Sequence, residues 1–197
     1  MHELAGVLAD KKGLTWIVVT ALFSVLVLVP FNQYQWALAG LTLRPAAVLP
    51  VVCGILWGPA AAYGLAAGNV AGDYFGGSWS LMSVFGVIVN FLYPYLSYRL
   101  WHRLMRDHEM KLDLYGLLSF WATTLVITFA CMLLLAACGT VFFGRPFESK
   151  FIGYFGNNIF WAMVVGPVLL LPIFTPAVKN GFVYGREWDR RLAGRAK

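Results

Sequence analysis

The chain has 197 residues, of which 60% are hydrophobic and 12% are charged, and its formal net charge is +6. This composition excludes a soluble domain of useful size, because little polar sequence is left once the apolar stretches are subtracted. The basic residues flank apolar stretches, which favours anchoring at a membrane surface over binding of nucleic acid. The three cysteines lie inside apolar stretches, without the spacing of a disulfide framework or a metal site.

Long segments without Asp, Glu, Lys or Arg dominate the sequence. Each is longer than the roughly 20 apolar residues that a helix needs to cross a bilayer core of about 30 Å. The first follows a short polar N-terminus with no small-residue cleavage site, so we expect a retained helix rather than a signal peptide. The pattern predicts an all-α, polytopic membrane protein with one domain over residues 1–197. The charge-free segments are 13–43, 45–72, 74–98, 114–144 and 151–178.

The segment 45–72 is ambiguous between one long span and two short helices. With two short helices the chain has six spans. An N-terminus inside the cell then leaves only Arg44, Arg145 and Lys150 outside among the lysines and arginines. Five spans with the N-terminus outside segregate the basic residues almost as well. Charge counting therefore favours six helices only slightly.

Local chemistry decides between the two topologies. Gly58-Pro59 lies in the middle of the segment, and proline suits the first turn of a new helix. Gly64, Gly68 and Gly72 then recur every four residues, which predicts a smooth face for close packing in lipid. The short helices should be partly shielded by their neighbours. The sequence thus predicts six transmembrane helices with both termini cytoplasmic, at about 14–36, 44–57, 59–75, 80–104, 113–141 and 151–176.

Signatures of catalysis and of metal binding are missing from the sequence. The histidines His2, His102 and His108 lie at or beyond the predicted cytoplasmic boundary, and only Asp73 and Glu148 are acids on the outer side. No Gly-x-Ser-x-Gly elbow, phosphate-binding loop or His-Glu-x-x-His motif occurs. We therefore expect no catalytic residue, no metal site and no enzyme.

Polar and aromatic residues gather instead on the predicted outer half. Amides and rings around a shielded cavity suit a small, flat, polar organic molecule. Each type has a plainer alternative: an interfacial belt for Trp and Tyr, helix–helix contacts for Asn90, and a structural ion pair for Arg44 with Asp73. The candidate substrate-binding residues are Asn32, Gln33, Tyr34, Trp36, Arg44, Asn69, Asp73, Trp79, Asn90, Tyr93, Asn157, Asn158 and Trp161.

Three motifs within residues 42–95 carry a family resemblance. They are the run from Arg44-Pro45 to Pro50, the break at Gly54–Pro59, and the glycine-rich helix that ends at Gly72-Asp73. The region resembles the substrate-binding S components of energy-coupling factor (ECF) transporters, which take up vitamins and similar micronutrients. The resemblance implies a six-helix fold in a prokaryotic cytoplasmic membrane. It also implies a pocket near the outer surface, capped by the loop at Asn32–Trp36.

The resemblance further implies protein partners: a membrane coupling subunit and two cytoplasmic ATPases. We also expect a small-molecule substrate and membrane lipid as partners, and no cofactor on this chain. Many members dock on the coupling subunit through an Ala-x-x-x-Ala pair on the first helix. Here Thr20 and Ser24 occupy that spacing and are the predicted docking residues. The leading hypothesis is substrate capture for uptake. A non-transporting assembly or sensor protein is the alternative, and a membrane enzyme is disfavoured.

Overall fold

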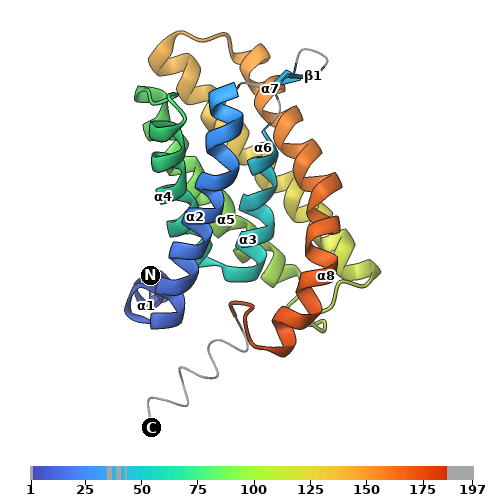
Figure 1. Cartoon of the computed structure of the whole chain (residues 1–197). Helices are drawn as coiled ribbons and strands as arrows, with labels where there is room; N and C mark the ends of the chain where they lie inside the picture. The colour runs from blue at the N-terminus through green and yellow to red at the C-terminus, as the bar shows by residue number, and fades with distance from the viewer. Residues whose placement is uncertain (1, 35–36, 39–40, 43, 186–197) are drawn as a thin grey trace.

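The computed structural model describes residues 2–34, 37–38, 41–42 and 44–185, and this part is helical apart from one short hairpin (Figure 1). The predicted all-helical class is confirmed. Strands β1 and β2 pair antiparallel over only two residues each. The elements are α1 (His2–Ala9), α2 (Lys11–Tyr34), β1 (Ala37–Leu38), β2 (Leu41–Thr42), the 3-10 helix η1 (Pro45–Val48), α3 (Leu49–Trp57), α4 (Pro59–Phe75), α5 (Leu81–Leu104), α6 (Leu114–Phe143), α7 (Phe147–Phe160), the π-helix η2 (Trp161–Val165) and α8 (Gly166–Lys179).

Four helices of the described chain are long and apolar enough to cross a membrane: α2, α5, α6 and the continuous run Phe147–Lys179. The chain is thus a multi-pass membrane protein. The segment Pro45–Trp57 is apolar but shorter than these spans. Helical segments occupy all six predicted ranges, with ends that differ by a few residues. Six complete crossings and cytoplasmic termini stay predictions. The short helix α1 was not predicted.

Helix α3 forms the centre of the bundle. Every residue from Leu49 to Leu56 is buried. A side chain at Gly54 would place its Cβ 2.4 Å from the carbonyl oxygen of Pro94 in α5, so only glycine allows the two helices to approach this closely. The expected shielding of a short helix by its neighbours is confirmed for α3.

The break between α3 and α4 falls at Gly58-Pro59, as predicted. Gly58 adopts φ +49°, a left-handed conformation that favours glycine, and Pro59 begins α4. A Cβ at Gly58 would also lie 2.9 Å from the Tyr184 ring, which comes from the segment after α8. The Tyr184 N–H donates to the Leu56 carbonyl oxygen at 2.7 Å. The end of the described chain thus packs against this corner.

The predicted glycine stripe of α4 packs against α2. An added Cβ at Gly64 would lie 1.7 Å from Thr20 Oγ1, and one at Gly68 would lie 2.6 Å from Ser24 Cβ. Thr20 and Ser24 are accordingly buried. The face of α2 that carries the predicted docking residues is therefore occupied within the chain itself. Docking of another subunit through these two residues stays a prediction, and it requires α2 to separate from α4 first.

The last long helix changes pitch in its middle. Pro167 has no N–H for the carbonyl of Met163, and the Trp121 indole N–H donates to that oxygen instead at 3.2 Å. Around this position Gly166 N–H donates to Trp161 O, the wider i→i+5 spacing of a π-helix. The π segment directly follows α7.

The basic residues of the described chain are divided between the two ends of the bundle. Figure 1 places α1 and the C-terminal end of α8 at one end, and the β-hairpin at the other, beside α7. Only Arg44, Arg145 and Lys150 belong to the hairpin end. The α1 end holds Lys11, Lys12, Arg99, Arg103, Arg106, Lys111 and Lys179.

Candidate functional site

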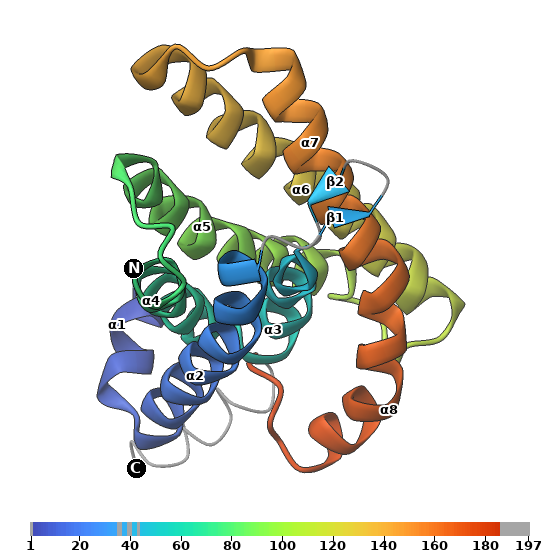
Figure 2. The ribbon, with the colours of Figure 1, turned by 45° about the horizontal axis from the view of Figure 1, so that its top comes forward.

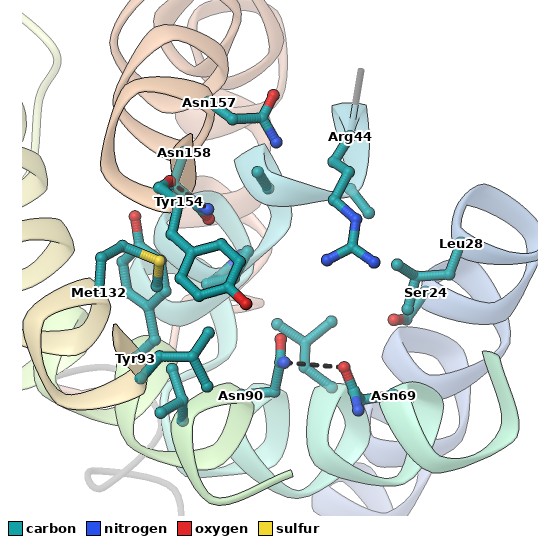
Figure 3. Close-up of a pocket in the computed structure, with 16 residues that line it drawn as sticks. Ser24, Leu28, Arg44, Asn69, Asn90, Tyr93, Met132, Tyr154, Asn157 and Asn158 are labelled. Carbon is teal, nitrogen blue, oxygen red and sulfur yellow. Dashed lines mark hydrogen bonds between the residues drawn. The ribbon is translucent and has the colours of Figure 1, made fainter. Parts of the chain in front are cut away.

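A cavity of about 100 Å³ lies between α2, η1, α4, α5, α6 and α7 (Figure 3). A second cavity of about 260 Å³ adjoins it, because Leu28, Arg44, Asn69, Asn90, Leu135 and Tyr154 line both. The first cavity is the candidate binding site. Its lining residues are Ser24, Leu28, Arg44, Ala46, Ala47, Pro50, Leu65, Asn69, Val89, Asn90, Tyr93, Met132, Leu135, Tyr154, Asn157 and Asn158.

A relay of hydrogen bonds runs along one side of the two cavities. Arg44 Nη2 donates to Asn32 Oδ1 at 3.3 Å, and Asn32 Nδ2 donates to Asp73 Oδ1 at 3.2 Å. Asn69 Nδ2 donates to the other carboxylate oxygen at 3.2 Å. Asn90 Nδ2 then donates to Asn69 Oδ1 at 2.9 Å. The relay fixes side chains from α2, α4 and α5 relative to one another.

Arg44 and Asp73 therefore meet through a third residue. Asn32 lies between them, and the described part of the chain contains no direct ion pair of the two. Asp73 also accepts from Ser78 Oγ at 3.3 Å, so three donors satisfy its carboxylate. The guanidinium of Arg44 points into the cavity (Figure 3). This geometry leaves Arg44 available to a ligand.

Helix α7 supplies the opposite wall. Tyr154, Asn157 and Asn158 share one face of α7, as the i, i+3, i+4 spacing requires, and all three line the cavity. Trp161 Nε1 donates to Asn157 Oδ1 at 3.1 Å, and Asn158 Nδ2 donates to the main-chain oxygen of Tyr154 at 2.9 Å. Both amides are thus held by their own helix.

The remaining wall is mostly apolar and includes a buried ring. Tyr93 is buried, and its hydroxyl makes a short hydrogen bond with Thr128 Oγ1 of α6. Leu65, Val89 and Met132 complete this wall. Since its hydroxyl is already paired, Tyr93 offers the cavity its ring.

The structure brings six of the predicted site residues to the first cavity: Arg44, Asn69, Asn90, Tyr93, Asn157 and Asn158. Asp73 lines the second cavity. Asn32 and Trp161 lie behind cavity residues and hold them by hydrogen bonds.

Other predicted residues are placed elsewhere. Gln33, Tyr34 and Trp79 are exposed and line neither cavity. Trp36 lies outside the described residues. Ligand contact by any of these residues stays a prediction.

Several polar or sulfur-containing cavity residues were missed as ligand candidates: Ser24, Met132 and Tyr154 in the first cavity, and Ser78, Ser80, Met82, Ser83 and Arg145 in the second. Tyr154 could have been found, because it precedes Asn157 by three residues on the same helical face. Ser24 was assigned to docking instead. Among the described residues, no group of three His, Cys, Asp or Glu side chains could hold a metal ion.

A family model described as QueT transporter matches residues 15–175. The chain belongs to the QueT transporter family. This family consists of ECF-type S components for the uptake of queuosine precursors, so the suspected resemblance is confirmed. The chain is accordingly a membrane transport protein for a small metabolite, which favours transport over the assembly or sensor alternative. No curated protein and no solved structure matches the chain.

Proposed function

We propose that this chain captures a queuosine precursor in the cavity between α4, α5 and α7 and delivers it into the cell. The observation that carries the proposal is a cavity with one arginine, four asparagines and two tyrosines among its lining residues. Membership of the QueT transporter family supports this ligand class.

The ring and the hydrogen-bonding groups of such a ligand match the residues that line the cavity. Queuosine is built on a 7-deazaguanine ring, which is flat and carries a carbonyl oxygen, a ring N–H and an amino group along one edge. The Tyr93 ring suits stacking, and Asn90, Asn157 and Asn158 suit hydrogen bonds to the edge. Arg44 suits the carbonyl oxygen or a substituent that reaches the second cavity.

The proposed orientation places the cavity at the outer surface. The α1 end of the bundle holds most of the basic residues of the described chain, and such an excess marks the cytoplasmic side. Arg44 and Asp73 belong to the opposite end. In this orientation the β-hairpin, which contacts α7, lies above the site and would act as a cap. The family resemblance gave that role to the preceding segment Asn32–Trp36, of which Asn32–Tyr34 ends α2 and the rest lies outside the described residues. The termini are then cytoplasmic, and α3 and α4 supply the fifth and sixth crossings.

The first prediction concerns ligand binding. The purified chain in lipid nanodiscs should bind 7-deazaguanine. The double variant Asn157→Ala/Asn158→Ala should bind it at least about tenfold more weakly, because each lost hydrogen bond costs about 1 kcal/mol. Isothermal titration calorimetry measures both affinities. The exposed amide Asn180 provides a control, because Asn180→Ala should leave binding unchanged. A wild-type chain that binds no 7-deazaguanine contradicts the proposed function.

The second prediction concerns energy coupling. The sequence has no phosphate-binding loop, so ATP hydrolysis belongs to two partner ATPases joined through a membrane coupling subunit. Vesicles that contain this chain alone should bind radiolabelled 7-deazaguanine without accumulating it. Vesicles that also contain the coupling module and internal ATP should accumulate it. ATP-independent accumulation by the chain alone contradicts the coupled mechanism.

A further inference from the structure

The second cavity, of about 260 Å³, has an excess of positive charge on its walls. Arg44 and Arg145 both line it, although one precedes η1 and the other follows α6. Asp73 is the one acid among its described lining residues, so two positive charges face one negative charge. The ion pairs of the described chain involve neither arginine.

The carboxylate of Asp73 is engaged within the protein, whereas the two guanidinium groups are largely not. Three side-chain donors hold the carboxylate. A guanidinium has five N–H donors, and Arg44 gives one of them to Asn32 Oδ1. Among the described residues, Arg145 makes a cation–π contact with the Phe143 ring at 5.7 Å and donates no side-chain hydrogen bond. The cavity therefore has more charged donors than acceptors, as an anion site requires.

The way in which α6 ends sets the Arg145 side chain beside the cavity. Gly144 adopts φ +61°, and its N–H donates to Thr140 O at 3.0 Å. The Arg145 N–H donates to Gly139 O at 3.1 Å, which completes a Schellman C-cap. A Cβ at Gly139 would lie 3.7 Å from Arg145 Cδ and 3.6 Å from Met82 Cε. The Arg145 side chain thus lies back along α6, toward the start of α5.

The start of α5 supplies a further donor to the same cavity. Figures 1 and 2 show this end of α5 beside the end of α6, and Met82 and Ser83 of its first turn line the cavity. The Ser80 N–H donates to Ser83 Oγ at 3.2 Å. Ser83 is 6% exposed, and no acceptor among the described residues takes its hydroxyl hydrogen. The positive end of the helix dipole also favours an anion here.

We propose that the second cavity binds a phosphate group, held by the guanidinium groups of Arg145 and Arg44 and by the Ser83 hydroxyl. The planar fork of a guanidinium matches two phosphate oxygens at once, and a hydroxyl can donate to a third. The cavity is roomy enough, since about 10–15 Å³ of such volume already holds a water molecule. This site goes beyond the proposed function, because it takes a second ligand and needs no flat ring.

The phosphate can come from two sources with the same chemistry: free phosphate, or the headgroup of an anionic phospholipid. The surroundings of the cavity suit the lipid, because exposed apolar side chains flank it on α5 and α6. Leu81 and Val141 are each 75% exposed and Phe142 is 64% exposed. Phe142 also stacks on Phe85 at 5.0 Å, so these side chains lie where the two helices meet. Acyl chains would lie against this surface.

The experiment has one arm for each source and uses the full chain in dodecyl maltoside micelles. Equilibrium dialysis measures the binding of ³²P-labelled inorganic phosphate. Native mass spectrometry measures the retention of phosphatidylglycerol against that of phosphatidylcholine. We expect specific binding in at least one arm, and Arg145→Gln should weaken it by about tenfold or more. Binding of phosphatidylglycerol alone identifies a lipid site, and binding of free phosphate identifies a solute site. Binding in neither arm overturns the inference.

Lys150→Gln is the matched control. It removes one positive charge from the same end of the bundle, but Lys150 lines neither cavity. We expect this variant to bind the phosphate probe like the wild-type chain. Equal binding by Arg145→Gln and Lys150→Gln would mean general attraction to a basic surface, or no role for Arg145, and either result overturns the inference.

Ser83→Ala decides the matter if Arg145→Gln does not fold. It removes a hydroxyl from the cavity wall and should weaken binding of the probe by about fivefold. Full binding by a folded Ser83→Ala variant overturns the inference. These measurements use no 7-deazaguanine, so their failure leaves the proposed function standing, and failure of 7-deazaguanine binding leaves the phosphate site standing.

Discussion

Asn90→Leu is expected to weaken 7-deazaguanine binding by about a hundredfold, or about 2.8 kcal/mol. Leucine has a similar shape but no polar atoms. The substitution removes the amide that is proposed to hydrogen-bond the ligand, and it also removes the side-chain donor that Asn69 Oδ1 and Gly86 O share. Asn69 is then held only through Asp73. Isothermal titration calorimetry in nanodiscs measures the loss, with the melting temperature recorded alongside.

Asn180→Leu is the control for this substitution. The Asn180 side chain likewise donates to a carbonyl oxygen four residues earlier, that of Pro176, but it is exposed and far from the cavity in the fold. The control variant should bind 7-deazaguanine like the wild-type chain. A correctly folded Asn90→Leu protein with unchanged affinity would show that Asn90 only joins helices, which was the plainer alternative for this residue.

The features that follow from covalent geometry could be predicted from the sequence. The break at Gly58-Pro59 and the glycine face of α4 are such features, because proline and glycine restrict or permit backbone approach wherever they occur. Hydrogen bonds between residues one helical turn apart could be predicted from the sequence in the same way. Asn69 with Asp73 and Asn157 with Trp161 are both four residues apart.

Contacts between segments that lie far apart in the sequence could not be predicted in this way. Asn32 donates to Asp73 across 41 residues, and Asn90 donates to Asn69 across 21. The sequence placed all four on the outer half, but only the structure shows that Asn32 joins Arg44 to Asp73. The number of crossings is open for a related reason. A segment as short as α3 can be apolar because neighbouring helices bury it, so its apolar sequence does not show whether it spans the membrane.

The assignment of Thr20 and Ser24 illustrates a second limit. A small-x-x-x-small pair predicts close approach of another helix, but it does not say which helix. Here Gly64 and Gly68 of the same chain carry the complementary spacing, and α4 occupies the face. Ser24 also lines the cavity, so the contact between α2 and α4 shapes one wall of the candidate site.

Gly64→Ala should therefore impair both stability and binding. The new Cβ would lie 1.7 Å from Thr20 Oγ1 and 2.6 Å from the main-chain oxygen of Ile17. Thr20 cannot turn away without cost, because its hydroxyl donates to Trp16 O at 2.7 Å. The helices must separate, and overpacking of this kind costs about 1–3 kcal/mol. The melting temperature should fall by roughly 2–4 °C per kcal/mol, and 7-deazaguanine affinity should fall with it.

Gly153→Ala separates this packing effect from helix propensity. Both substitutions gain the roughly 0.5–1 kcal/mol by which alanine favours a helix over glycine. Gly153 in α7 has open space where its Cβ would lie, so this variant should be as stable as the wild-type chain or slightly more stable. Adding Thr20→Ala to Gly64→Ala should restore only part of the loss, because the Ile17 main-chain oxygen remains in contact. Equal melting temperatures for Gly64→Ala and Gly153→Ala would mean that α2 and α4 are not packed as closely as the structure places them.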